Sequence, residues 1–156
     1  METELNLIDL IHRGGVYKDI EGSTPEEVYA NFCKTAKLPE DLSPEFVYNA
    51  LCAREKVLST AVGNGIALPH ARAPIVKNEN EQRVCVIYLK KPIEMNAPDD
   101  REVFVMFVLL SHNSQIHLKV LTELAALFRK VRFRKALEEK VDESQLVNLI
   151  LELNEK

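Results

Sequence analysis

Two short apolar runs near the middle of the chain constrain its fold more than any other feature. Residues 84–89 read VCVIYL and residues 103–110 read VFVMFVLL, and polar segments bound both runs. Their β-branched and aromatic residues favour strands, and both runs are short for ordinary helices. Because neither run alternates with polar residues, each predicted strand must be covered on both of its faces. We therefore expect an α/β fold, in which helices lie in layers around a core of buried strands.

Helix signals lie on both sides of these runs. Thr24 and Glu27 form a capping box around Pro25, and the segment from Asp142 to Gln145 forms a second one. Ser43 before Pro44 is a further helix start. Ser114 is predicted to cap a long helix whose apolar stripe holds Leu118, Leu121, Leu124, Ala125 and Phe128. The other helices are expected at residues 5–13, 25–37, 44–56 and 143–153, and shorter strands at 16–20 and 66–68.

Composition excludes several classes of protein. The 156 residues carry a net charge of −4, which argues against a protein that binds nucleic acid through a general basic surface. The one basic cluster, residues 129–135, is interpreted as a solvated helical face. The three cysteines, which are Cys33, Cys52 and Cys85, are widely spaced, so neither a disulfide framework nor a thiolate zinc site is expected. With no signal-type or membrane-spanning run, the sequence predicts a soluble, cytoplasmic single domain over residues 1–156.

The segment Ser59–Arg72, which reads STAVGNGIALPHAR, places a histidine on stiffened backbone. Glycines permit a tight turn upstream, while Pro69 fixes its own φ and restricts the residue before it. A histidine held in this way, with Arg72 close by in sequence, suits reversible chemistry on an anion such as phosphate. We therefore select His70 as the candidate reactive residue.

The other histidines carry weaker signals. His112 and His117 are five residues apart, about 140° around a helix, and no carboxylate completes a ligand set, so a metal site is not predicted. Spacing favours a half-buried, hydrogen-bonded role for His117, although a place near a helix N-terminus would also suit an anion site. As candidate nucleophiles, Ser59, Ser111 and Cys52 lack a recognisable activating context, and the chain has no P-loop.

Several of these motifs together resemble one known family, the mannitol/fructose-class EIIA domain (type-2 EIIA) of the bacterial phosphoenolpyruvate-dependent phosphotransferase system. The resemblance covers nearly the whole chain. It rests on Arg54-Glu55, Ser59-Thr60, the block from Gly63 to His70, and His117-Leu118-x-x-Leu121-x-x-Leu124-Ala125. The resemblance implies a mixed β-sheet core flanked by helices, that is, an α/β sandwich, and implies no cofactor.

The resemblance also implies a mechanism and partners. His70 corresponds to the residue that accepts a phosphoryl group from phospho-HPr and passes it to an EIIB partner. Arg54 resembles the phosphate-stabilising arginine and His117 the second active-site histidine, while Ser59 and Thr60 match hydroxyl-bearing positions near the phosphate pocket. A backbone hydrogen bond to one ring nitrogen of His70 would leave the other, Nε2, free to attack. The alternative is a regulatory role, similar to the nitrogen-related EIIA proteins, in which phosphorylated His70 controls binding to target proteins.

The chain departs from this pattern between the second apolar run and the predicted helix of His117. Residues 110–114 lack the proline that the resemblance leads us to expect, and they contain the additional His112. Because His70, Arg54 and His117 are unaffected, the departure bears on partner specificity rather than on the chemistry.

Overall fold

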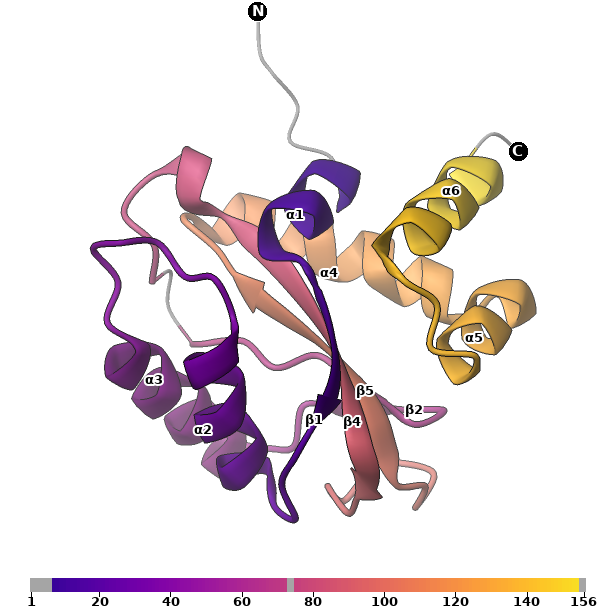
Figure 1. Cartoon of the computed structure of the whole chain (residues 1–156), viewed down its shortest axis with the longest axis horizontal. Coiled ribbons are helices and arrows are strands. Elements are labelled where there is room, and N and C mark those ends of the chain that lie inside the picture. The colour runs from indigo at the N-terminus through magenta and orange to yellow at the C-terminus, as the bar shows by residue number, and fades with distance from the viewer. Residues whose placement is uncertain (1–6, 73–74, 155–156) are drawn as a thin grey trace, which may run out of the picture.

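A computed structural model describes residues 7–72 and 75–154. The five strands in these residues form one mixed sheet in the order β1-β4-β5-β3-β2 (Figure 1). The strands are β1 (Val16–Ile20), β2 (Ala61–Gly63), β3 (Ile66–Ala67), β4 (Arg83–Ile93) and β5 (Val103–Leu110). β1 runs parallel to β4 and β3 runs parallel to β5, whereas the β4–β5 and β2–β3 pairs are antiparallel. The expected mixed sheet is confirmed.

Helices cover both faces of this sheet. They are α1 (Leu7–Gly14), α2 (Pro25–Thr35), α3 (Pro44–Val57), α4 (Ser114–Phe128), α5 (Val131–Glu138) and α6 (Glu143–Asn154), with a short 3₁₀ turn, η1 (Glu79–Glu81). α2 and α3 pack in one apolar cluster, and α1, α4, α5 and α6 pack in a second cluster on the opposite face (Figure 1). This arrangement is the predicted α/β sandwich.

The two central strands divide their side chains between these clusters. In β4, Cys85 and Ile87 lie in the cluster of α2 and α3, whereas Val86 and Tyr88 lie in the other cluster. Burial on both faces explains why the apolar runs are uninterrupted. β4 extends past the predicted residues 84–89 because its last residues pair with β5 while residues 90–92 are exposed, so the apolar signal stops before the strand does.

The predicted helix caps are present, with small shifts at some ends. The Thr24 hydroxyl accepts the Glu27 N–H at 3.2 Å, and Asp142 and Gln145 cap each other reciprocally. α2 ends at Thr35, two residues before the predicted end, because the backbone is already extended at its C-cap, Ala36. α4 begins at Ser114 itself, and the Asn113 carbonyl accepts the His117 N–H. The cap position is therefore one residue earlier than predicted.

The apolar stripe of α4 was placed wrongly in one respect. Leu118 is 65% exposed, and the residues that bury against the sheet are Val120, Leu124, Leu127 and Phe128. α4 carries two adjoining apolar stripes, so helical periodicity alone could not decide which stripe packs. The basic cluster that follows does form a solvated helical face, because Arg132 and Lys135 of α5 are exposed while Phe133 is buried.

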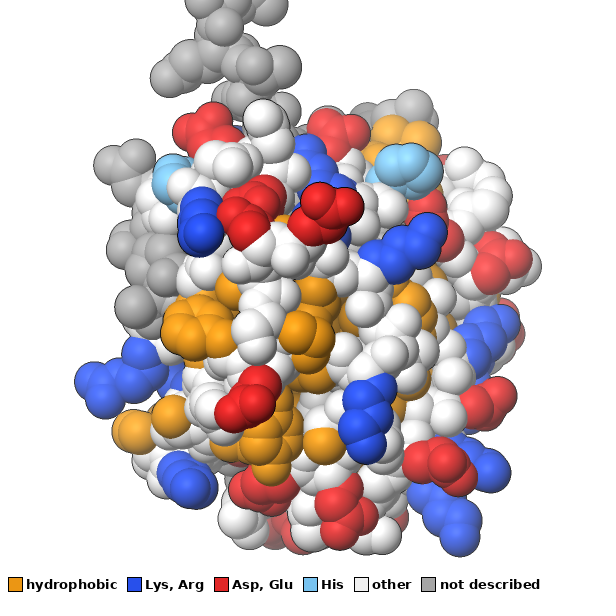
Figure 2. Space-filling model, turned by 60° about the vertical axis from the view of Figure 1, so that its left-hand side comes forward, with side chains coloured by type: hydrophobic (Ala, Val, Ile, Leu, Met, Phe, Trp, Pro, Cys, Tyr) orange, Lys and Arg blue, Asp and Glu red, His pale blue; other side chains and the backbone are white. Residues whose placement is uncertain are grey.

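The surface on the side of α2 and α3 is mixed. Figure 2 shows this side, where apolar side chains gather across the middle with charged side chains around them. Phe46 of α3, which is 52% exposed, is among the apolar side chains that the fold leaves open to solvent. Within residues 7–72 and 75–154, no helix combines the length and the apolar character needed to cross a membrane.

Candidate functional site

His70 lies just beyond the β2–β3 hairpin. The hairpin turns through Gly63, Asn64 and Gly65, all of which have positive φ, and a Cβ on Gly65 would lie 2.5 Å from the Phe104 ring. After β3 the chain continues beside β5, where the Leu109 N–H donates to the Pro69 carbonyl at 2.9 Å and His70 pairs with Leu109. The glycine turn and the proline therefore place His70 at the end of a strand. This agrees with the stiffened backbone expected from the sequence.

The ring of His70 has a defined orientation. Its Nδ1 lies 2.6 Å from the Leu68 carbonyl oxygen. A carbonyl only accepts, so Nδ1 carries the proton and Nε2 keeps its lone pair. Burial lowers the pKa of His70, and the charge of Arg54 lowers it further, while the bond to Leu68 opposes both effects. His70 is thus a neutral imidazole near pH 7 with Nε2 free, which agrees with the orientation expected from the sequence.

His117 approaches His70 from α4. The two ring centroids are 4.8 Å apart and the rings meet edge to face at 65°. His117 is the fourth residue of α4, next to a helix N-terminus whose free N–H groups attract anions. Its Nδ1 lies 3.0 Å from the hydroxyl of Ser111. Burial, followed by the nearby His70 and Arg54, lowers the pKa of His117 to about 4, so this ring too is neutral near pH 7.

Arg54 lies in the last turn of α3, close enough for its charge to act on the two histidines. Its Nη1 donates to the Leu58 carbonyl at 2.6 Å, which ties the guanidinium to the C-terminal end of its own helix. The charge of Arg54 acts on the pKa of both His70 and His117. Three of the residues selected from the sequence therefore meet at one site, although they come from α3, the end of β3 and α4.

Ser59 and Thr60 have internal roles beside this site. The Ser59 hydroxyl donates to the Met95 carbonyl and accepts the Ala61 N–H, and the Thr60 hydroxyl donates to Glu55 at 2.7 Å. The Thr60 carbonyl in turn accepts the Leu68 N–H at 2.9 Å. The two hydroxyls therefore hold the start of the hairpin against Met95 and Glu55, and the Thr60 backbone is what bonds to the segment that carries His70.

Glu55 and Ser111 are two residues whose roles sequence reasoning missed. The Glu55 carboxylate accepts three hydrogen bonds, from the Tyr29 hydroxyl at 2.5 Å and from the Thr60 N–H and hydroxyl. The sequence presents Glu55 only as part of a motif and Ser111 only as a candidate nucleophile. The available signal for Ser111 was its position directly after the second apolar run, since strand ends are common places for functional groups.

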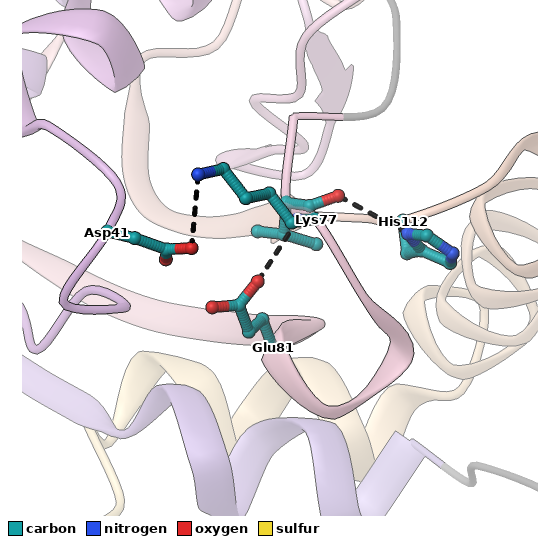
Figure 3. Close-up of polar contacts among 5 residues, drawn as sticks. Asp41, Lys77, Glu81 and His112 are labelled. Atoms are coloured by element: carbon teal, nitrogen blue, oxygen red, sulfur yellow. Dashed lines mark hydrogen bonds and ion pairs between the residues drawn. The ribbon is translucent and has the colours of Figure 1, made fainter.

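His112 and Arg72 are not part of this cluster of contacts. His112 Nδ1 lies 3.3 Å from the Val76 carbonyl (Figure 3). The backbone N–H of His112 donates to the Gln82 side chain. Nearby, the Lys77 ammonium forms an ion pair with Asp41, and the Lys77 backbone N–H donates to the Glu81 carboxylate (Figure 3). Arg72 is exposed in the bend after His70. His112 thus helps to hold residues 75–82 against the start of α4.

Among residues 7–72 and 75–154, no group of three or more histidine, cysteine or acidic side chains is arranged to hold a metal ion. The three cysteines are buried as free thiols, and burial raises the pKa of Cys33 and Cys85 to about 12. These thiols are therefore protonated and unreactive near neutral pH.

Comparison with known proteins identifies one matching family. Residues 9–153 match the sequence model of the phosphoenolpyruvate-dependent sugar phosphotransferase system, EIIA 2. A nitrogen regulatory protein of Pseudomonas aeruginosa is 30% identical over 119 residues, which are 75% of each chain.

Two solved structures extend this comparison. The nitrogen regulatory protein IIA-Ntr of Neisseria meningitidis is 28% identical, with a TM-score of 0.76 over 87% of this chain and 92% of that one. Escherichia coli enzyme IIA mannitol, in a complex with phosphorylated enzyme IIB, has a TM-score of 0.64 over 95% of this chain and 97% of that one. At 16% identity, the second likeness shows a shared fold only.

Proposed function

This chain belongs to the EIIA type-2 family of the phosphoenolpyruvate-dependent sugar phosphotransferase system, and on that premise we propose that His70 carries a phosphoryl group. The observation that carries the proposal is the bond between His70 Nδ1 and the Leu68 carbonyl, 2.6 Å long, which leaves Nε2 as the free nucleophile. The lowered pKa of His70 supports it further, because only the neutral ring can attack.

The proposed step forms one bond and breaks another. The Nε2 lone pair of His70 attacks the phosphorus of a phosphorylated HPr-like protein, and the bond from phosphorus to the donor breaks, its electron pair leaving with the donor. The phosphorylated ring carries positive charge, which the Leu68 carbonyl stabilises through the Nδ1–H. Transfer onward to an acceptor reverses these changes and restores the neutral ring.

Charge stabilisation comes from groups that are already in place. Phosphoryl transfer depends mainly on positioning and on stabilising the three equatorial oxygens. Arg54, whose charge acts on both histidines, supplies a permanently charged planar donor. The N-terminus of α4, next to His117, adds partial positive charge. The Arg54 side chain and the backbone N–H groups of α4 can therefore stabilise the oxygens of the phosphoryl group during its transfer.

The destination of the phosphoryl group has two candidates. As a phosphocarrier, the chain would pass it to an EIIB protein or domain for sugar uptake, and the enzyme IIA–IIB complex of E. coli supports an EIIB partner. As a regulator, the chain would bind target proteins according to the phosphorylation state of His70. The relatives from P. aeruginosa and N. meningitidis are both named nitrogen regulatory proteins, which favours the regulatory role. Either role would place the chain in the cytoplasm.

Reconstituted phosphorylation tests the proposal. The chain is incubated with labelled phosphoenolpyruvate, enzyme I and HPr, and the modified residue is mapped by mass spectrometry. We expect an acid-labile label that is lost in His70→Ala and retained in the matched control His12→Ala, because the His12 side chain is 81% exposed and lies on α1. Absence of label from the wild-type chain, or label that survives His70→Ala, would refute the phosphocarrier chemistry.

A chase then separates the two destinations. Candidate EIIB proteins are added to the labelled chain, and the loss of label from His70 is followed with time. Rapid loss to an EIIB protein supports transport, whereas label that persists with every EIIB protein supports the regulatory role.

A further inference from the structure

We propose that Ser111 is a positioning residue, which holds His117 in the tautomer that carries its proton on Nε2. In this form His117 can donate a hydrogen bond to the phosphoryl group on His70. The inference rests on the proposed function, since it assigns a role within the same site.

Ser111 is well placed to orient His117. It directly follows β5, is only 4% exposed, and its hydroxyl oxygen lies 3.0 Å from His117 Nδ1. Its backbone is held as well, because the Ser111 carbonyl accepts the N–H groups of Ile75 at 3.1 Å and Val76 at 3.3 Å. The hydroxyl therefore projects from a fixed strand end toward the ring on α4.

The hydroxyl proton decides the direction of this hydrogen bond. A serine hydroxyl has one proton to donate, and a buried donor without an acceptor is costly. Among the described residues, His117 Nδ1 is the partner of the Ser111 hydroxyl. If Nδ1 carried the ring proton and donated to Ser111, the hydroxyl proton would have no acceptor there. The geometry is satisfied when Ser111 donates and Nδ1 accepts.

The proton of a neutral His117 then lies on Nε2. The low pKa of His117 ensures that the ring holds a single proton near pH 7, so protonation of Nε2 follows from acceptance at Nδ1. His70 has the opposite arrangement, with its proton on Nδ1 and its lone pair on Nε2. The two rings, 4.8 Å apart, are thus complementary: one can attack phosphorus while the other donates to a phosphoryl oxygen.

The other tautomer of His117 would act against transfer. A lone pair on its Nε2 would face the negative oxygens of the phosphoryl group and repel them. The Ser111 hydroxyl removes this alternative before a partner arrives, so no reorganisation is needed during the reaction.

Nitrogen-15 NMR of the histidine rings tests the tautomer directly. Protonated and unprotonated ring nitrogens have well-separated chemical shifts, so each tautomer can be read in the unphosphorylated chain at pH 7. In the wild type we expect His117 to be protonated on Nε2 and His70 on Nδ1. In Ser111→Ala we expect His117 to become a mixture of both tautomers while His70 is unchanged. A wild-type His117 protonated on Nδ1, or an unaltered tautomer in Ser111→Ala, would overturn the proposal.

Transfer kinetics provide the second measurement. In Ser111→Ala we expect phosphoryl transfer from HPr to His70 to slow about tenfold, which corresponds to one hydrogen bond. The matched control is Ser144→Ala, on the exposed surface of α6, which should transfer at the wild-type rate. A wild-type rate in Ser111→Ala contradicts the proposal. If the wild-type chain accepts no phosphoryl group, the proposed function fails, whereas the NMR result still decides whether Ser111 sets the tautomer.

Discussion

The two histidines of the site are oriented by different parts of the chain. His70 is held by backbone: its ring bonds to the Leu68 carbonyl, and its strand bonds to β5 through the Pro69 carbonyl. His117 is held by a side chain, the hydroxyl of Ser111. Backbone groups are present whatever the sequence, so the first arrangement follows from strand pairing. The second depends on one particular residue and is lost when that residue changes.

The charge of Arg54 acts on both histidines, so its replacement is expected to have the largest effect on phosphoryl transfer. In Arg54→Gln the positive charge is lost, so phosphoryl transfer to His70 should fall about 10²- to 10³-fold. The pKa of both histidines should rise together, because the charge of Arg54 lowers each of them. Transfer assays and NMR titration of the two rings measure these changes.

The control for this prediction is Arg129→Gln, which removes an exposed arginine after α4. It should leave the transfer rate and both pKa values as they are in the wild type. If the pKa of only one histidine changes in Arg54→Gln, then the charge of Arg54 acts on that histidine alone.

Glu55→Gln tests whether the surroundings of His70 can be changed without changing those of His117. An amide cannot accept all three hydrogen bonds that the Glu55 carboxylate receives from Tyr29 and Thr60. We expect the free energy of unfolding to fall by about 2 kcal/mol, measured by urea denaturation. His70 resonances should shift, because Thr60 is bonded to Leu68, while the His117 tautomer should not change.

Glu138→Gln, on the exposed surface of α5, is the matched control and should unfold with nearly the wild-type free energy. An altered tautomer of His117 in Glu55→Gln would mean that the two histidines are not oriented independently of each other.

An effect of similar size is expected in the pH dependence of stability, through His117. Burial holds the pKa of His117 at about 4, whereas an unfolded histidine titrates near its ordinary value of 6.5. As the pH falls from 6.5 to 4, the unfolded state takes up a proton that the folded state does not, so folding loses stability. For this partly exposed ring we expect a loss of about 2 kcal/mol between pH 7 and pH 4.5.

Urea denaturation of the wild type and His117→Asn at both pH values measures this contribution. The variant should lose about 2 kcal/mol less than the wild type over this range, since asparagine does not titrate. Equal losses would show that His117 is not held neutral by the fold.

Much of the architecture could be predicted because its signals are local. β5 has its predicted bounds, since its apolar run begins and ends with the strand, and Thr24, Ser43 and Asp142 all cap helices as their patterns indicate. β2 was not predicted, because a strand of three residues is defined by its pairing with β3 rather than by a pattern of its own. Leu118 was misplaced because two apolar stripes share one helix.

The sequence by itself determined the layered fold and the stiff segment that presents His70, since burial on both faces, a glycine turn and a proline act through neighbouring residues. The resemblance named Arg54 and His117 as companions of His70, but only the tertiary structure places them near it and adds Ser111 and Glu55. Arg54, His117 and Ser111 come together through the packing of α3, β5 and α4, and Glu55 acquires its role by accepting bonds from Tyr29 and Thr60. The physical reason is that hydrogen bonds and charges act over a few ångströms in space, and those proximities exist only once the helices have packed on the sheet.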